Sequence, residues 1–109
     1  MKQGELWYAI LGPVLGSEQD GYRPVLIISG NLMNQYAPVV ICCPLTTKIK
    51  HYKGNPILSP TENGLSVTSE VLVTHIRSIS KDRLSKRIGE VPESVITEVK
   101  QTLKELTTF

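Results

Sequence analysis

Arg23 is the residue of this sequence best placed to do chemistry, because it stands where a polar loop meets an apolar strand. The loop spans residues 16–21, and the glycines at its two ends favour turns because they adopt positive φ angles without strain. The strand follows over residues 22–29, and its β-branched centre predicts burial on both faces. A guanidinium at this junction can donate to two oxygens of one phosphate. Taken alone, an exposed arginine at a strand end is usually just solvated.

Hydroxyl groups occupy a similar position at the end of a second strand. Residues 39–43 are apolar without polar alternation, and Pro44 limits pairing beside their end. Thr46 and Thr47 follow directly. The Thr46 hydroxyl can supply a hydrogen-bond donor to a phosphate.

The densest uncompensated basic run comes next and contains Lys48, Lys50, His51, Tyr52 and Lys53. Interleaved positive charge and an aromatic ring suit single-stranded nucleic acid, since the charges follow the backbone and the ring stacks on a base. An edge strand or loop that lysines protect from aggregation has the same pattern. Without other signals, that structural interpretation of the run is the better guess.

The composition is that of one ordinary globular domain. With 109 residues, of which 40% are hydrophobic and 20% charged, the chain has enough apolar surface for a single core over residues 1–109. A net charge of +2 is weak evidence for a nucleic-acid partner, so such a role depends on how the charge is distributed. No apolar stretch approaches the ~20 residues that span a bilayer, which predicts a soluble protein.

The two cysteines, Cys42 and Cys43, are adjacent. Neighbouring side chains of a strand point to opposite faces, which makes a disulfide between them geometrically awkward and favours a reduced, cytosolic setting. His51 and His75 are distant in sequence, so no zinc-type spacing exists. We expect neither a metal nor another cofactor.

The remaining pattern is mostly one of strands. Strands are expected over residues 5–10, 57–58, 70–79 and 86–91, with short helical turns over 32–36 and from Ser80 to Leu84. Trp7 is expected to be a core or subunit-contact residue, and His75 a half-buried strand residue.

One longer helix is expected at the C-terminus. Pro92 suits its first position, and one apolar stripe is formed by Val95, Ile96, Val99, Leu103 and Leu106. Strands first and one helix last indicate a small, mostly antiparallel barrel with the helix packed on its sheet.

One block of the sequence is specific to a known family. Gly16-Ser17-Glu18-Gln19, a three-residue spacer, Arg23-Pro24 and the aliphatic strand together closely resemble the signature of MazF/PemK-type toxins. These toxins are the endoribonuclease half of toxin-antitoxin pairs. The resemblance covers nearly the whole chain, although its other matches would each be weak alone: Gly4-Glu5, Pro44-Leu45-Thr46-Thr47, Asn63-Gly64-Leu65, Ile76-Arg77-Ser78-Ile79 and Arg83-Leu84.

The resemblance implies a fold and an activity. The fold is the mostly β, SH3-like barrel shared with plasmid-encoded gyrase inhibitors, with a C-terminal helix. The activity is metal-independent cleavage of single-stranded RNA at short sequences by a cytoplasmic homodimer. A cognate antitoxin, acidic and partly disordered, neutralises such a toxin, and the two together bind DNA.

The resemblance also implies the roles of individual residues. Arg23 and Thr46 occupy the family's catalytic positions. Contacts to the substrate are expected from Ser17, Glu18, Gln19, Thr47, Lys48, Lys50, His51, Tyr52, Lys53 and His75. The residues that act as general acid and base are not assigned. A guanidinium holds its proton too tightly for this role, and the two histidines are better proton carriers. Glu18 is a candidate base or loop anchor. Thr68 and His75 depart from the family's pattern, so a relative's cleavage sequence does not transfer to this chain.

Two other classes of function remain open. One is a non-nucleolytic toxin on the same barrel that binds a topoisomerase, which the presence of both Arg23 and Thr46 disfavours. The other is a non-catalytic nucleic-acid-binding module, for which the basic run alone suffices.

Overall fold

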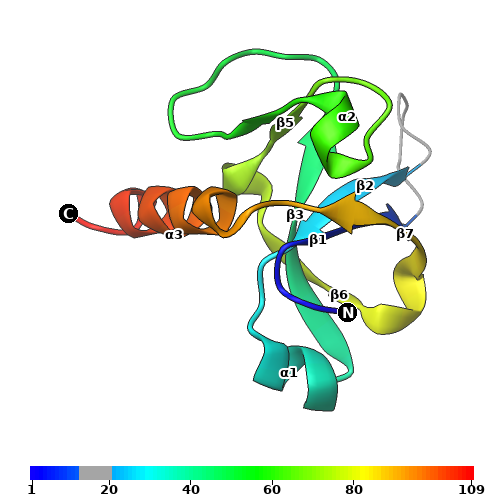
Figure 1. Ribbon diagram of the computed structural model, residues 1–109. Coiled ribbons are helices and arrows are strands. Elements are labelled where there is room, and N and C mark those ends of the chain that lie inside the picture. Colours follow the sequence, from blue (N-terminus) through cyan, green and yellow to red (C-terminus); the bar gives the residue numbers. More distant parts are fainter. Residues whose placement is uncertain (13–20) are drawn as a thin grey trace.

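In the computed structural model, which describes residues 1–12 and 21–109, seven strands pair antiparallel in a curled sheet (Figure 1). The strands are β1 Glu5–Ile10, β2 Tyr22–Ile27, β3 Val39–Thr46, β4 Ile57–Leu58, β5 Ser69–Val71, β6 Arg77–Ser80 and β7 Leu84–Glu90. Their order is β4-β5-β3-β2-β1-β7, and β6 pairs with the first half of β3. The mostly β architecture predicted from the sequence is confirmed.

Helical segments join and flank the strands. They are α1 Asn31–Tyr36, α2 Pro60–Asn63, α3 Glu93–Leu106 and the 3₁₀ turns η1 Val73–His75 and η2 Lys81–Arg83. The Ser80 hydroxyl accepts from the amide of Asp82 and caps η2, as predicted. Gly64 ends α2 with a φ of 84°, a left-handed conformation that favours glycine.

Strand β3 separates two hydrophobic clusters. Cys43 lies in one cluster with Leu6, Leu26 and Val99, whereas Cys42 lies in the other. This second cluster contains Ala9, Val25, Ile27, Val40 and Ile79. Alternate residues of β2 and β3 are therefore buried on opposite faces, as their unbroken apolar runs predicted. Complete burial of a side chain the size of Leu26 contributes about 1.5–3 kcal/mol.

The C-terminal helix packs against the first cluster with its N-terminal part, and its C-terminal end extends away from the sheet (Figure 1). Ile96 and Val99 pack into the first cluster, with Val95 and Leu103 partly buried beside them, so the predicted apolar stripe is confirmed for four residues. Leu106 is 54% exposed near the end of the helix. Pro92 is the residue before the first helical turn and not its first member, because α3 begins at Glu93.

The prediction of one continuous strand over residues 70–79 is wrong, because this region is divided into β5, η1 and β6. The Asn55 side chain accepts the amide of Val73 at 3.2 Å, which takes this amide out of the sheet's hydrogen-bond ladder. The chain then turns through η1 and resumes as β6. His75 is consequently an exposed residue of a 3₁₀ turn and not a half-buried strand residue.

Three other strands have boundaries that differ from the prediction. Strand β7 covers Leu84–Glu90 and not residues 86–91. Strand β2 ends at Ile27, because the amides of Ile28 and Ser29 both donate to the Ile41 carbonyl and break the ladder. Strand β3 continues through Pro44 to Thr46, since the Pro44 carbonyl still accepts the amide of Leu72.

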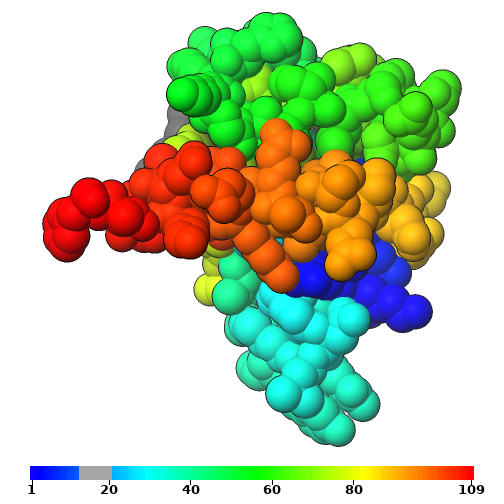
Figure 2. All heavy atoms as spheres, turned by 60° about the vertical axis from the view of Figure 1, so that its left-hand side comes forward, coloured from blue at the N-terminus to red at the C-terminus, as the bar shows by residue number. Residues whose placement is uncertain are grey.

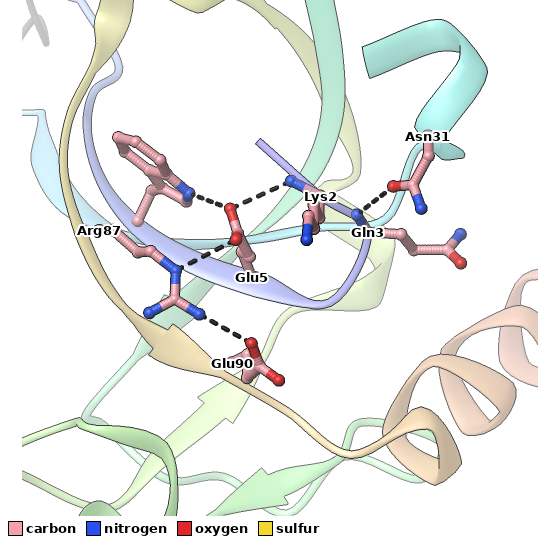
Figure 3. Close-up of polar contacts among 7 residues, drawn as sticks. Lys2, Gln3, Glu5, Asn31, Arg87 and Glu90 are labelled. Carbon is pink, nitrogen blue, oxygen red and sulfur yellow. Dashed lines mark hydrogen bonds and ion pairs between the residues drawn. The ribbon is translucent and has the colours of Figure 1, made fainter. Parts of the chain in front are cut away.

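A buried carboxylate connects β1 to β7 (Figure 3). Glu5 accepts from the Lys2 amide at 3.0 Å, from Trp7 Nε1 at 2.9 Å and from Arg87 Nε at 3.1 Å. Burial alone would raise the pKa of Glu5, but these three hydrogen bonds outweigh it and lower the pKa. Arg87 also pairs with Glu90 at 2.7 Å. Trp7 is thus held in the fold, in agreement with a packing role.

Candidate functional site

Arg23 and Thr46 lie in one surface depression. In the register between β2 and β3, Val25 stands opposite Pro44, and two further residues along this register set Arg23 beside Thr46. Both residues line a depression of about 160 Å³, together with Pro24, Leu45, Thr47 and Lys48. The antiparallel pairing of two strands thus brings together side chains that are far apart in sequence.

A second depression adjoins the first. Its volume is about 270 Å³, and it is lined by Thr46, Lys48, Lys50, Tyr52, Leu72 and His75. Thr46 and Lys48 line both depressions, so the two are continuous. Among residues 1–12 and 21–109, neither lining includes a carboxylate, and the cations there are suited to an anionic ligand.

A third depression adjoins the first, and the three together are called the groove below. It measures about 170 Å³ and is lined by Tyr8, Pro24, Thr47, Leu65, Ser66, Val67 and Ser69. Pro24 and Thr47 are shared with the first depression. Sequence reasoning missed Tyr8, which lies opposite Pro24 in the pairing of β1 with β2, and the segment after Gly64.

The two central side chains are available for hydrogen bonding. Within the described residues, Arg23 makes no hydrogen bond or ion pair. The Thr46 hydroxyl oxygen accepts the Lys48 amide at 3.1 Å, which leaves its hydrogen available to a ligand. The pair can therefore present a forked cationic donor and a neutral donor to a single anion.

The Glu70 carboxylate accepts hydrogen bonds from the loop of residues 47–56, called the basic loop below. One carboxylate oxygen accepts the amides of Lys50 at 2.7 Å and His51 at 3.0 Å, and the other accepts the Tyr52 amide at 3.1 Å and Asn55 Nδ2 at 2.9 Å. Burial by itself would raise the pKa of Glu70, but these hydrogen bonds reverse the effect and lower the pKa to about 2. The side chain is 0% exposed and ionised. Sequence reasoning missed its role, although an acidic residue within an apolar strand was a signal.

The structure distributes the predicted substrate contacts among several places. Thr47, Lys48, Lys50, Tyr52 and His75 line the groove. His51 and Lys53 are exposed on the same loop but are not among the lining residues of these depressions, and His51 has a φ of 56°. Ser17, Glu18 and Gln19 lie outside the described residues.

The remaining candidate groups are two thiols. Cys42 and Cys43 are buried and unpaired, and burial raises the pKa of Cys42 to about 11 and that of Cys43 to about 12. Residues 1–12 and 21–109 contain no group of three His, Cys, Asp or Glu side chains arranged to hold a metal ion. Among the described helices, none has both the length and the apolar character needed to cross a membrane.

A curled antiparallel sheet, a C-terminal helix and a cationic groove where the start of β2 meets the end of β3 define a small, mostly β protein with a surface suited to anions. The sequence family described as the PemK-like, MazF-like toxin of type II toxin-antitoxin systems matches residues 2–107. The chain belongs to this family, as its sequence block indicated.

Named relatives agree with this assignment. Endoribonuclease EndoA of Bacillus subtilis is 32% identical over 106 residues, which cover 95% of this chain and 91% of the relative. Endoribonuclease MazF9 of Mycobacterium tuberculosis is 34% identical over 110 residues, which cover 95% and 93%.

Solved structures show the same fold. A crystal structure of MazF from Deinococcus radiodurans has a TM-score of 0.80 and 32% identity, and the match covers 97% of this chain and 94% of that one. A MazE-MazF structure from the same organism matches with a TM-score of 0.80, 31% identity and the same coverage of both chains.

Proposed function

We propose that this protein is a metal-independent endoribonuclease toxin that cleaves single-stranded RNA at short sequences. The observation that carries the proposal is the meeting of Arg23 and Thr46 in one depression, next to a second one lined by Lys48 and Lys50. The relatives EndoA and MazF9, both named endoribonucleases, support the same activity.

In the proposed reaction, Arg23 and Thr46 stabilise the transition state. The ribose 2′-oxygen attacks phosphorus, the new O–P bond forms as the bond to the 5′-oxygen breaks, and the phosphate gains negative charge during the exchange. The Arg23 guanidinium donates to two phosphate oxygens, and the Thr46 hydroxyl donates to the same group. Donors fixed in advance at the developing charge supply the largest share of such stabilisation.

Two protons must also move in this reaction, one from the 2′-hydroxyl and one to the 5′-oxygen. His75 lines the depression beside Thr46, which makes it the better-placed histidine, whereas His51 lies outside the lining. An imidazole side chain is a common proton carrier in catalysis. Glu18 remains a candidate for the base, and its position lies outside the described residues.

The proposal includes the partners of the toxin. This chain has the fold of a chain in a MazE-MazF structure. We therefore expect a cognate antitoxin to cover the basic groove and inhibit cleavage. We place the active homodimer in the cytoplasm, where two unpaired thiols stay reduced. Together with its antitoxin, the toxin is expected to bind DNA.

Incubation of purified protein with single-stranded RNA in excess chelator tests the proposal. Cleavage under these conditions is the expected result. RNA binding without cleavage would indicate a non-catalytic binding module. The absence of both would leave the topoisomerase-directed toxin, whose distinguishing observation would be inhibition of purified topoisomerase.

A further inference from the structure

The loop between β3 and β4, residues 47–56, contains no strand or helix and arches away from the sheet (green, upper part of Figure 1). Its own backbone supplies one hydrogen bond, from the Asn55 amide to the Tyr52 carbonyl at 3.1 Å. From outside, the Thr102 hydroxyl donates to the Gly54 carbonyl at 2.7 Å. The amides of residues 50, 51 and 52 all converge on Glu70. With the Asn55 side chain included, this one carboxylate accepts four hydrogen bonds from the loop, more than any other group that contacts it.

Glu70 also belongs to the framework of the groove. It lies in β5, directly opposite Thr46 of β3 in the antiparallel register, and opposite Ile57 of β4 on its other side. The same strand pair thus fixes the position of Thr46 and, through the carboxylate, that of Lys50 and Tyr52. All three of these residues line the second depression.

We propose that Glu70 is a positioning residue that sets the geometry of this depression for an RNA nucleotide by fixing the backbone that carries Lys50 and Tyr52. This inference rests on the proposed function. Glu70 is fully buried, so it touches no substrate and acts only through the loop. A cation and an aromatic ring held in fixed places lose less conformational entropy on binding a phosphate and a base.

Glutamine is the informative substitution because it has the shape of glutamate but only one acceptor oxygen. Each Glu70 oxygen receives two N–H donors, so an amide group in either orientation must face two of them with its own N–H groups. Asn55 cannot turn to compensate without cost, because its oxygen already accepts the Val73 amide. Glu70→Gln is expected to release one side of the loop.

The change in net charge and the loss of positioning predict opposite effects of Glu70→Gln on RNA binding. Removing a negative charge near a polyanion should tighten binding, whereas loss of positioning should weaken it. Glu98→Gln is the matched control, because it removes one carboxylate from an exposed position of α3. The sign of the difference between the two variants separates positioning from charge.

The experiment measures binding of a single-stranded oligoribonucleotide whose 2′-hydroxyls are methylated, so that no attacking group is present. We expect Glu70→Gln to bind roughly 10-fold or more weakly than Glu98→Gln, because two side chains must then be ordered on binding. With cleavable RNA, KM should rise more than kcat falls. Exchange of the amide hydrogens of residues 50–52 should accelerate.

Equal or tighter binding by folded Glu70→Gln, relative to Glu98→Gln, would overturn the proposal. A purely structural role would lower Tm and leave binding per folded molecule unchanged, which also overturns it. If Glu70→Gln does not fold, Asn55→Ala removes one donor and leaves the carboxylate, and weaker binding is expected from it too; unchanged binding contradicts the proposal. If the unaltered protein neither binds nor cleaves RNA, the proposed function fails, whereas accelerated amide exchange would still show that Glu70 anchors the loop.

Discussion

Arg23 gains its importance from the residues around it. Within the described residues its guanidinium has no partner, and the depression that it lines contains no carboxylate to neutralise it. A cation in such a place is available to a phosphate, whereas most surface arginines share their charge with neighbouring acids and water.

Replacement of Arg23 by alanine tests its role in stabilising the transition state. The variant should fold normally and lose cleavage by roughly 10²-fold or more, the scale of one fixed donor to a developing charge. Lysine should restore only part of the rate, because it has the charge but not the planar fork. Single-turnover cleavage at saturating RNA measures the effect.

Arg77→Ala supplies the control for Arg23, since Arg77 is exposed on β6 and lies outside the groove linings. A near-normal saturated rate in folded Arg23→Ala would reassign Arg23 to binding. The chemistry would then fall to His51 or His75.

Thr46→Val removes the hydroxyl at nearly constant volume. We expect slower cleavage, and the loss should not add to that of Arg23→Ala in the double variant, because both groups act on one phosphate. Single-turnover rates of the four proteins complete the cycle. Fully additive losses would mean that Thr46 and Arg23 act on separate groups.

At the residue scale, the sequence predicted the central pair and missed its support. Arg23 and Thr46 could be predicted as a pair because Arg23 precedes one apolar run, Thr46 follows another, and both match a family signature. The role of Glu70 could not be found, because it depends on four donors that the loop presents only after folding.

The basic loop is the element that should govern the salt dependence of binding. Neutralising Lys48, Lys50 or Lys53 individually should shallow the slope of log affinity against log salt by about 0.7 for each lost phosphate contact with single-stranded RNA. Titrations at several salt concentrations measure this slope. Lys100→Gln on α3 is the control, and an unchanged slope in the loop variants would leave these lysines only a role against aggregation.

The anchor of this loop should also contribute to stability in a pH-dependent manner. The pKa of Glu70 is about 2 in the folded protein against an ordinary value of 4.5, so unfolding takes up a proton between these values. The stability that Glu70 contributes is therefore complete above about pH 4.5 and is lost as the pH falls toward 2. The difference in free energy of unfolding between the unaltered protein and Glu70→Gln should narrow across this range.

Urea denaturation at pH 6, 4 and 3 measures how this difference in free energy of unfolding changes as Glu70 becomes protonated. Glu98→Gln again controls for the loss of one negative charge. A difference that stays constant with pH would mean that Glu70 is not the group that titrates.

At the element scale, strand existence was easier to predict than strand ends. Apolar runs located β1, β2, β3 and β4, since burial imposes a pattern on every residue of a strand. The break between β5 and β6 left no such pattern, because it arises where the Asn55 side chain captures the Val73 amide. That contact joins residues 18 positions apart and exists only in the folded chain.

For the whole molecule, we predict a homodimer. The helix α1 and the end of α3 project from the body (Figure 2), and α1 carries the exposed apolar side chains of Leu32 and Tyr36. Sedimentation at micromolar concentration should give twice the chain mass of 12.1 kDa, and specific cleavage activity should fall on dilution. A monomer with full cleavage activity would contradict the prediction.

The pairing of β1 with β7 has a consequence for how the chain acquires its structure. Glu5 stands opposite Glu90, so the first strand finds one of its neighbours only after most of the chain is present. Contacts of such long sequence separation give a high contact order, which slows folding because the entropy of loop closure is lost before the contact forms. At a synthesis rate of ~5–20 residues per second, the nascent chain spends seconds with β1 lacking this partner. The body of the fold is therefore incomplete until β7 has been synthesised, and during this interval a partner protein can meet a chain that is only partly folded.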